Sequence, residues 1–146
     1  MLTQPIFADY LQEYGRKGQE AIALGTTKLL TRLFWYMVEF GLIRGAAGIK
    51  AYGAGMLSSA TETAYSVDSD QPHRIKFDLA RVMRTDYRID TFQQSYFVID
   101  DFAELFTAMQ QPFAPIYADV QGLPLIPATE VIESDQVLQV GRQHAA

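Results

Sequence analysis

Glu39 is the residue whose type and surroundings point most directly to chemistry. A carboxylate among apolar neighbours needs a cation, a hydrogen-bond donor, a bound proton or a metal ion, because burying it unpaired carries a large desolvation cost. A salt bridge to Arg32 or Arg44 is the simplest alternative to a metal ion. On a continuous helix, four residues share the face of Glu39 at helical spacing: Trp35, Tyr36, Leu42 and Ile43.

Two glycines and two serines form the next candidate group. Gly53 and Gly55 make a lone Gly-x-Gly, whereas a dinucleotide-binding fingerprint needs a third glycine between a strand and a helix. A tight turn that packs closely on another element is the simpler interpretation. Ser58 and Ser59 follow, but no Gly-x-Ser-x-Gly surrounds them and a nucleophilic serine needs a base beside it. We therefore expect these serines to cap a helix.

Histidine and cysteine usage limits the metal chemistry. The sequence has no cysteine, which excludes thiolate zinc sites and disulfides. Its two histidines, His73 and His144, form no His-x-x-x-His pair, so one helix does not supply two imidazole ligands. We expect both to be exposed and without function. Phe34 to Tyr36, together with Phe40, fit a hydrophobic core better than a cofactor site.

Composition and charge bound the fold and the partners. The 146 residues are 49% hydrophobic and 20% charged, which predicts one folded domain with a substantial core. The net charge is −5, and Arg142 is the only Lys or Arg after Arg88. Because nucleic-acid binding normally needs clustered basic residues, nucleic acid is not expected as a partner.

No segment predicts a membrane span or a signal peptide. The longest strongly apolar run, from Leu33 to Ile43, is interrupted by Glu39 and is too short to cross a bilayer. The first residues carry no basic segment followed by an apolar one. The sequence therefore predicts a soluble, cytoplasmic protein with no membrane partner.

Helices are expected to position most of these residues. Periodicity and capping residues predict a helix from Pro5, weakened at Gly15 and Gly18, and a buried helix over 29–43 that ends at Gly45 and Gly48. Further on, we expect a strand running into a glycine turn over 49–55, a helix over 56–67, a strand near Ile75 and Phe77, a strand over 96–99, and a helix over 102–109 capped by Asp100. The fold class is mainly α with a few short β-strands.

The C-terminal region reads differently. Proline punctuates the chain after Pro112, which argues against further long helices. About ten final residues are expected to form a loose tail. We therefore divide the chain into residues 1–112 and a proline-punctuated tail, 113–146.

Four strings resemble one enzyme family closely and in order. They are PIFADY at 5–10, FWYMVEFGLI at 34–43, YGAGMLSS at 52–59 and RTDYRIDTFQ at 84–93. The chain is similar, from Leu2 to about Phe106, to the pterin-dependent aromatic amino acid hydroxylases, and within them to the bacterial phenylalanine 4-hydroxylases. These oxidoreductases are monooxygenases of phenylalanine catabolism, which hydroxylate an aromatic ring with O₂, a tetrahydropterin and non-haem iron(II).

The resemblance implies site residues. The family holds iron through two histidines and one glutamate, which leaves open positions for oxygen. The glutamate of the W-x-x-V-E-F-G string falls on Glu39, so the resemblance implies a metal ligand there. By the same matching, Trp35 and Phe40 would line the pocket for the substrate ring. Gly55 and Ser58 would lie on the active-site loop, where the family's serine supports an iron-ligating histidine.

The sequence also departs from the family pattern. The family's His-Glu-x-x-x-His string precedes the Leu-Thr-x-Pro segment, so both histidine ligands would fall upstream of Met1, together with most pterin contacts and the arginine that binds the substrate carboxylate. Phe34 stands where tyrosine is usual, and Met37 where threonine is usual. Nothing after Pro112 resembles a tetramerisation helix, so we expect a monomer.

The prediction for function follows from this partial match. The chain resembles the C-terminal half of the catalytic domain of a phenylalanine 4-monooxygenase, a family that takes a small aromatic amino acid as its substrate. With one of three protein ligands to iron, the isolated chain is expected to be inactive. The alternative is a non-catalytic remnant that binds an aromatic ligand or serves a structural role. A fragment, a truncated reading frame and a degenerate paralogue all fit the sequence.

Overall fold

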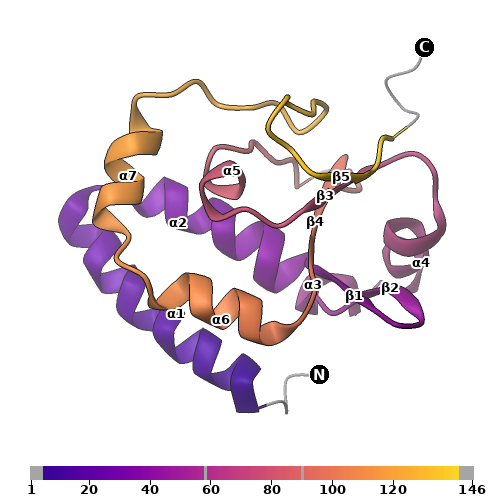
Figure 1. The fold of residues 1–146 in the computed structure, drawn as a ribbon, viewed down its shortest axis with the longest axis horizontal. Helices are drawn as coiled ribbons and strands as arrows, with labels where there is room; N and C mark the ends of the chain where they lie inside the picture. Colours follow the sequence, from indigo (N-terminus) through magenta and orange to yellow (C-terminus); the bar gives the residue numbers. More distant parts are fainter. Residues whose placement is uncertain (1–4, 58, 90, 142–146) are drawn as a thin grey trace.

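A computed structural model describes residues 5–57, 59–89 and 91–141 of the chain. Seven α-helices, one π-helical segment and five strands cover most of these residues (Figure 1). In chain order they are α1 (Pro5–Leu24), α2 (Thr27–Phe34), η1 (Trp35–Glu39), β1 (Leu42–Gly45), β2 (Gly48–Ala51), α3 (Ala54–Leu57), α4 (Ala60–Asp68), β3 (His73–Lys76), α5 (Leu79–Met83), β4 (Ser95–Ile99), α6 (Phe102–Gln110), α7 (Ala114–Gln121) and β5 (Val137–Gln139). The predicted class, mainly α with a few short strands, is confirmed.

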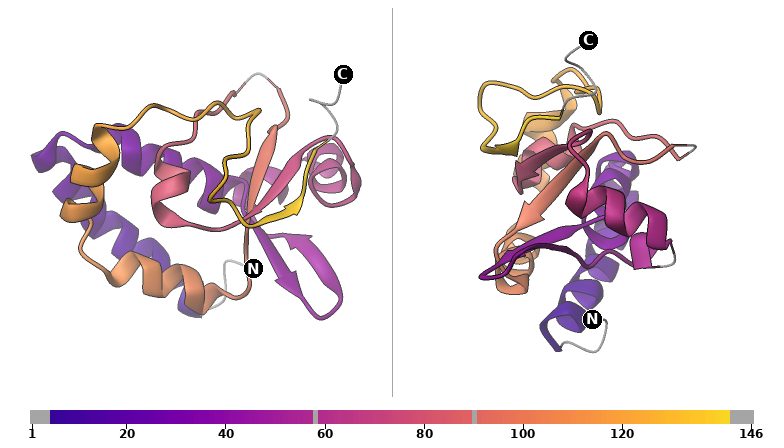
Figure 2. Two further views of the ribbon diagram at one scale, coloured as in Figure 1. Left: turned by 45° about the horizontal axis from the view of Figure 1, so that its top comes forward. Right: turned by 90° about the vertical axis from the view of Figure 1, so that its right-hand side faces the viewer.

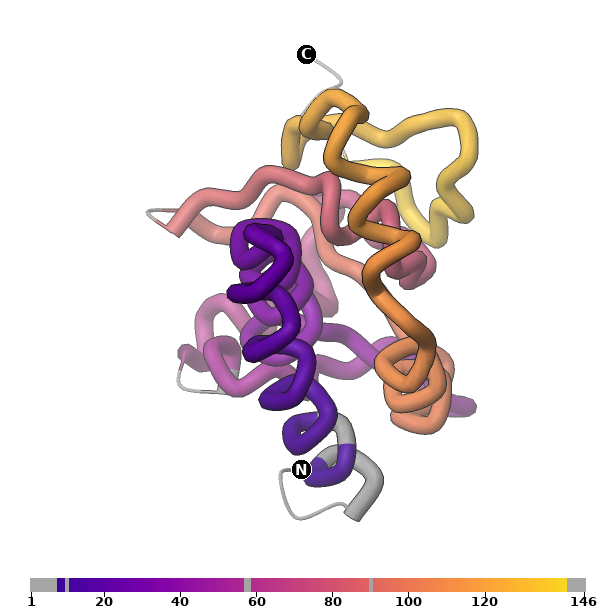
Figure 3. Tube along the Cα trace, turned by 90° about the vertical axis from the view of Figure 1, so that its left-hand side faces the viewer, coloured from indigo at the N-terminus to yellow at the C-terminus, as the bar shows by residue number. Residues whose placement is uncertain are grey.

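Most helices gather on one side of a small sheet, while α3 and α4 pack on its other side. α1 packs against α2 and α6, and α2 packs against α5 (Figure 1). Figure 3 shows α1 beside α2, with α7 and α6 following each other along the right-hand side of the view. The main hydrophobic core lies between these helices and the sheet, and it includes Leu33, Tyr36, Phe97 and Phe113. No helix in the described parts of the chain is both long and apolar enough to cross a membrane.

The sheet has the strand order β2-β1-β4-β3-β5. β4 pairs in parallel with both β1 and β3, while β2 and β5 pair antiparallel at the two edges. All five residues of β4 are buried. Alternate side chains of a strand point to opposite faces, so Phe97 and Ile99 join the main core while Tyr96 and Val98 join a second, smaller core. β4 therefore forms the centre of the sheet, with packing on both faces.

The predicted helix over 29–43 is wrong at its C-terminal end. The helical segment ends with η1, and β1 begins at Leu42, so Leu42 and Ile43 lie on a strand rather than on the face of Glu39. Gly45 and Gly48 face each other in the β1–β2 hairpin, where Gly48 has a φ of 113°. That left-handed conformation suits glycine. Figure 2 shows this hairpin at the opposite end of the molecule from α7.

Other predicted elements are confirmed with shifted boundaries. α1 runs through Gly15 and Gly18 as one helix. The predicted helix over 56–67 is two helices, α3 and α4, and Ser59 caps the second by accepting a hydrogen bond from the Glu62 N–H at 3.2 Å. The strand over 96–99 is β4. The helix over 102–109 is α6, which is capped by Asp101 rather than Asp100.

The chain after Pro112 is folded as far as Gly141, so the loose tail expected for about the last ten residues is wrong over its described part, 137–141. α7 begins with Pro115 in its first turn, where the missing N–H of proline leaves no hydrogen bond unmade. β5 pairs with β3, and Ile126 forms a bridge with Thr85. Figure 2 shows this segment crossing over α5 to reach the edge of the sheet.

A buried salt bridge also connects the loop before β5 to α5. Arg81 donates to both carboxylate oxygens of Asp135, at 2.9 and 3.1 Å, and the two side chains are 4% and 3% exposed. Arg81 also donates to the Glu130 carbonyl oxygen at 3.0 Å. The guanidinium thus joins α5 to the loop before β5 through several charge-assisted hydrogen bonds.

Candidate functional site

The π-helical segment η1 determines which side chains meet at Glu39. The Phe40 N–H donates to the Trp35 carbonyl oxygen at 3.1 Å, a bond that spans five residues instead of the four of an α-helix. The rings of Trp35 and Phe40 consequently lie side by side, with centroids 4.8 Å apart. Single π-turns occur often at functional sites. Here the turn brings together two aromatic residues that α-helical spacing would separate.

The Glu39 carboxylate lies against the glycine turn. A Cβ added to Gly55 would stand 2.8 Å from Glu39 Oε2 and 3.1 Å from Phe40 Cζ, and a Cβ added to Gly53 would overlap the Glu39 carbonyl group. The expected tight turn that packs closely on another element is therefore present. The structure brings Glu39, Phe40 and Gly55 together, with Trp35 beside Phe40.

The Glu39 carboxylate has no cation beside it among the described residues. Arg32 donates to the Met83 carbonyl oxygen at 3.2 Å, and Arg44 pairs with Asp100 at 3.0 Å. The salt-bridge alternative is therefore wrong for both arginines. Glu39 is half-buried, less than its predicted surroundings imply, because Leu42 and Ile43 have left its face for β1. Ser58 lies outside the described residues.

Two residues without a predicted role complete the aromatic group. The Tyr87 ring stacks on Trp35, with centroids 4.7 Å apart and planes inclined by 20°. The Trp35 indole N–H donates to Gln93 Oε1 at 3.0 Å. We call Trp35, Phe40 and Tyr87 the aromatic row. Both Tyr87 and Gln93 belong to the string at 84–93 that resembles the hydroxylase family. That resemblance is the sequence feature from which their place near the site could have been predicted.

Glu62 is a buried carboxylate that the sequence reading missed. It is 8% exposed, and its Oε2 accepts hydrogen bonds from the Tyr96 hydroxyl at 2.9 Å and the Gln93 N–H at 3.2 Å. Burial, followed by the charge of Glu62, raises the pKa of Tyr96. Ser59 and Glu62 have the spacing of a capping box, which is a local motif at a helix start. That motif does not predict the contacts of Glu62 with Gln93 and Tyr96, about thirty positions further along the chain.

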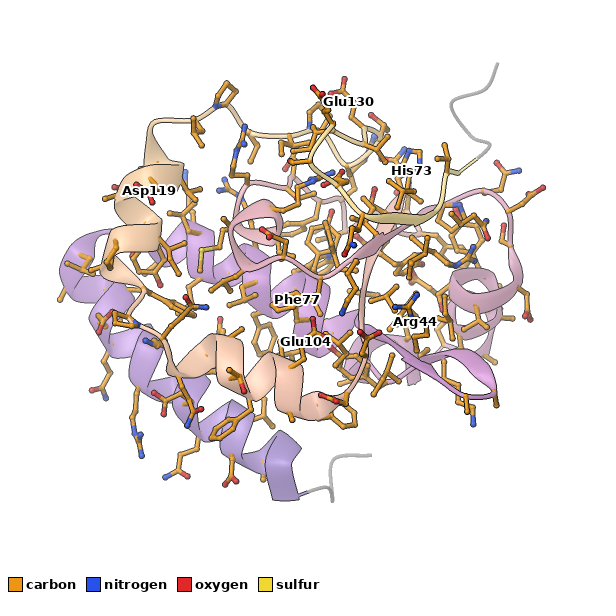
Figure 4. The ribbon with its side chains drawn as sticks, viewed as in Figure 1. Arg44, His73, Phe77, Glu104, Asp119 and Glu130 are labelled. Atoms are coloured by element: carbon orange, nitrogen blue, oxygen red, sulfur yellow. The ribbon has the colours of Figure 1, made fainter. Side chains whose placement is uncertain are left out.

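His73 is buried rather than exposed, so that prediction is wrong. It is 2% exposed, and its Nδ1 accepts from the Gly141 N–H at 2.7 Å while Nε2 lies 2.9 Å from the Thr129 carbonyl oxygen. A neutral ring with its proton on Nε2 satisfies both contacts. Figure 4 shows His73 beside the C-terminal segment. Both ring nitrogens are therefore engaged by the backbone; His144 lies outside the described residues.

One hollow of about 650 Å³ lies elsewhere, between α5, α6, α7 and the loop that follows β3. Phe77 and Glu104, both labelled in Figure 4, contribute to its wall, together with Thr107. None of the residues that line it belongs to the aromatic row or to the glycine turn. The convergence of a half-buried carboxylate and aromatic rings remains the stronger candidate site.

An oxygen ligand with no cation partner is chemically suited to a metal ion, and Glu39 offers one. A single carboxylate with two imidazoles is the ligand set typical of non-haem iron(II) oxygenases. Within residues 5–57, 59–89 and 91–141, no group of three or more His, Cys, Asp or Glu side chains is placed to hold a metal ion. The described residues thus do not form a complete three-ligand site around Glu39.

Curated proteins similar to this chain bear the name of one enzyme. The phenylalanine-4-hydroxylase of Ralstonia nicotianae is 52% identical over 141 residues, which are 97% of this chain and 45% of that protein. The phenylalanine-4-hydroxylase of Chromobacterium violaceum is 51% identical over 97% of this chain and 48% of its own length. The chain therefore spans about half the length of the curated relatives it matches.

Solved structures share the fold. A crystal structure of the Chromobacterium violaceum phenylalanine hydroxylase with iron and phenylalanine bound superposes with a TM-score of 0.92 at 51% identity, over 94% of this chain and 51% of that one. The cobalt-bound form of that enzyme gives a TM-score of 0.90 over 92% of this chain and 49% of that one.

The family match extends beyond Phe106, where the resemblance in the sequence ended. The family model for biopterin-dependent aromatic amino acid hydroxylases matches residues 1–140, which include α7 and β5. On this match, the chain belongs to the biopterin-dependent aromatic amino acid hydroxylase family.

Proposed function

We propose that this chain supplies the glutamate-bearing half of a phenylalanine 4-hydroxylase, which converts L-phenylalanine to L-tyrosine. The observation that carries the proposal is the half-buried Glu39 carboxylate, which lies beside Phe40 and Gly55 with no cation partner among the described residues. Relatives about half identical to the chain bear this name, and one of them binds iron and phenylalanine.

Glu39 is the residue we assign to iron. Bound iron would supply the oxygen activation for ring hydroxylation, together with the tetrahydropterin that the family's description implies. The two imidazole ligands and the pterin contacts would come from the half of the relatives that this chain does not span. His73 is not a candidate, since backbone groups engage both of its ring nitrogens. The isolated chain is therefore expected to hydroxylate nothing.

The aromatic row is assigned to the substrate ring. Trp35 and Phe40 would contact the phenyl group, and Tyr87 supports the indole from its stacked face. Gly55 leaves space for the carboxylate and for the tip of Phe40 at the same point. Holding the ring close to the metal matters because a misplacement of about 1 Å can cost about 100-fold in rate.

A chimera tests the proposal. The N-terminal half of the Ralstonia nicotianae relative is fused to this chain and supplied with iron(II), tetrahydropterin, O₂ and phenylalanine. We expect tyrosine formation by the chimera and none by the isolated chain. Glu39→Gln in the chimera should lower iron content and turnover together, because the amide keeps the shape but loses the anionic ligand. Glu104→Gln, on α6, serves as the matched control and should change neither.

Two results would overturn the assignment. Full iron content and full turnover in the Glu39→Gln chimera would make Glu39 an ordinary carboxylate. A folded chimera that binds phenylalanine but forms no tyrosine would favour the non-catalytic remnant that binds an aromatic ligand.

A further inference from the structure

The orientation of the Trp35 indole is controlled by a chain of buried polar groups. Gln93 is 3% exposed and both ends of its side-chain amide are engaged: Oε1 accepts from the indole N–H at 3.0 Å, and Nε2 donates to the Arg88 carbonyl oxygen at 3.1 Å. Because the indole offers only a donor, the amide must present its oxygen to Trp35. The amide thus has one favourable orientation.

Glu62 holds the backbone that carries this amide. The Gln93 N–H donates to Glu62 Oε2 at 3.2 Å, and the Tyr96 hydroxyl donates to the same oxygen at 2.9 Å. Glu62 is itself fixed in the first turn of α4, where the Ser59 side chain accepts from its N–H. One carboxylate therefore joins α4, β4 and the loop before β4.

Ring contacts alone would let the Trp35 indole rotate in its plane, and the hydrogen bond from the indole N–H to Gln93 Oε1 prevents that rotation. Stacking of Trp35 on Tyr87 fixes the plane of the ring approximately but lets it slide or rotate within that plane. A hydrogen bond from the indole N–H sets the direction within the plane. A buried indole N–H without an acceptor would also carry a desolvation cost, which favours the anchored position.

We propose that Gln93 and Glu62 are positioning residues that lock the Trp35 ring in the aromatic row. Gln93 acts directly on the indole, and Glu62 acts through Gln93. This inference rests on the proposed function for the role of Trp35 beside the substrate ring. The locked indole defines one wall of that pocket and so favours a flat aromatic substrate over a bulkier side chain.

The chain provides its own control in Glu104. It occupies the same position in α6 that Glu62 has in α4: the Asp101 side chain caps the helix by accepting from the Glu104 N–H at 2.8 Å. Its carboxylate, however, accepts from Lys76 Nζ at 2.7 Å, and its side chain is 30% exposed. Replacing it removes an equivalent helix-start carboxylate without touching Gln93 or Trp35.

The experiment uses the tryptophan as a probe, since Trp35 is the only one in the sequence. Fluorescence anisotropy and acrylamide quenching are measured on the whole 146-residue chain, with Gln93→Met, Glu62→Ala, Glu62→Gln and Glu104→Ala as variants. In Gln93→Met and Glu62→Ala the anisotropy should fall and the quenching constant should rise about twofold, as the side chain gains nanosecond motion. Glu62→Gln keeps an acceptor oxygen and should restore the parent signal; Glu104→Ala should not change it.

Circular dichroism identifies the folded variants, and Gln93→Met decides the matter if Glu62→Ala fails to fold. A folded Gln93→Met chain with unchanged anisotropy and quenching overturns the proposal. So does a folded Glu104→Ala chain that changes as much as Glu62→Ala. Since the measurement needs no iron, pterin or turnover, an inactive chimera with a responsive Trp35 would count against the proposed function alone.

Discussion

The Glu39 carboxylate and the Cα of Gly55 are in such close contact that a methyl group would not fit between them: a Cβ on Gly55 would lie 2.8 Å from Glu39 Oε2. The backbone of Gly55 does not adopt a positive φ, so space and not conformation requires glycine here. Gly55 therefore leaves the space that the carboxylate occupies.

The two glycines of this turn are expected to differ in their tolerance of alanine. In Gly53→Ala the new methyl group meets the Glu39 backbone, which moves only with η1, and we expect a loss of about 1–3 kcal/mol in the free energy of unfolding. In Gly55→Ala it meets the end of the Glu39 side chain, which can rotate away, so the loss should be smaller. Urea unfolding measures both. Equal losses would show that the carboxylate is held as rigidly as the backbone.

Removing one partner of the buried Arg81–Asp135 salt bridge should destabilise the protein strongly. Asp135→Asn leaves the guanidinium charge buried without its counter-ion, and we expect a loss of about 3–5 kcal/mol. The exposed pair between Arg16 and Glu13 is the control, since Glu13→Gln should cost less than about 1 kcal/mol. Chemical unfolding of the two variants tests the difference, and similar losses would contradict the importance of burial.

His73 should fix the C-terminal segment near Gly141 to β3 and should also raise the free energy of unfolding of the whole chain. His73→Phe fills the same space but leaves the Gly141 N–H without its acceptor and the Thr129 carbonyl without its donor. Each buried group left unpaired should cost about 1–3 kcal/mol. Amide hydrogen exchange provides the measurement: the Gly141 amide should exchange faster than in the parent chain. Unchanged protection there would mean that β5 docks without the histidine.

Alkaline pH should destabilise the fold through its buried tyrosines. Burial raises the pKa of Tyr14 from 10.0 to about 12, with smaller contributions from Tyr117 and Tyr87. Below pH 10 the neutral form is present in both states and its contribution to stability is complete. As the pH rises from about 10 to about 12, the unfolded state loses the proton first, so the free energy of unfolding falls.

Tyr14→Phe isolates this effect, because phenylalanine keeps the ring and has no proton to lose. The variant should lose stability less steeply than the parent chain over the same pH range, as measured by urea unfolding at several pH values. Identical slopes would exclude Tyr14 as a source of the alkaline sensitivity. Burial also raises the pKa of Tyr36 and Tyr96, so some decline should remain.

Local patterns predicted the elements well, and most of the misses involve long-range contacts. The strand at β4 follows from a run of aromatic and β-branched residues, and the helix at α6 follows from an aspartate near its start. The π-turn at η1 was not predicted from the sequence, because the prediction assumed α-helical spacing as far as Ile43. Because the turn contains one extra residue, the Phe40 ring lies against Trp35, and Leu42 belongs to a strand instead of the helix.

The candidate site was only partly predictable for the same reason. Glu39 stood out because its neighbours are apolar, and the structure places Phe40 and Gly55 beside it. Glu62 attracted no prediction, and His73 was expected to be exposed. Their partners lie far along the chain, near Gln93 and Gly141, and no local pattern connects such positions.

The placement of β5 at the edge of the sheet also bears on self-association. β3 joins β4 on one side and β5 on the other, so the last strand covers a row of backbone groups that would otherwise be open. An open edge can pair with another chain and begin aggregation. A chain cut before Val137 would therefore keep its candidate site yet expose a strand that recruits other copies of itself.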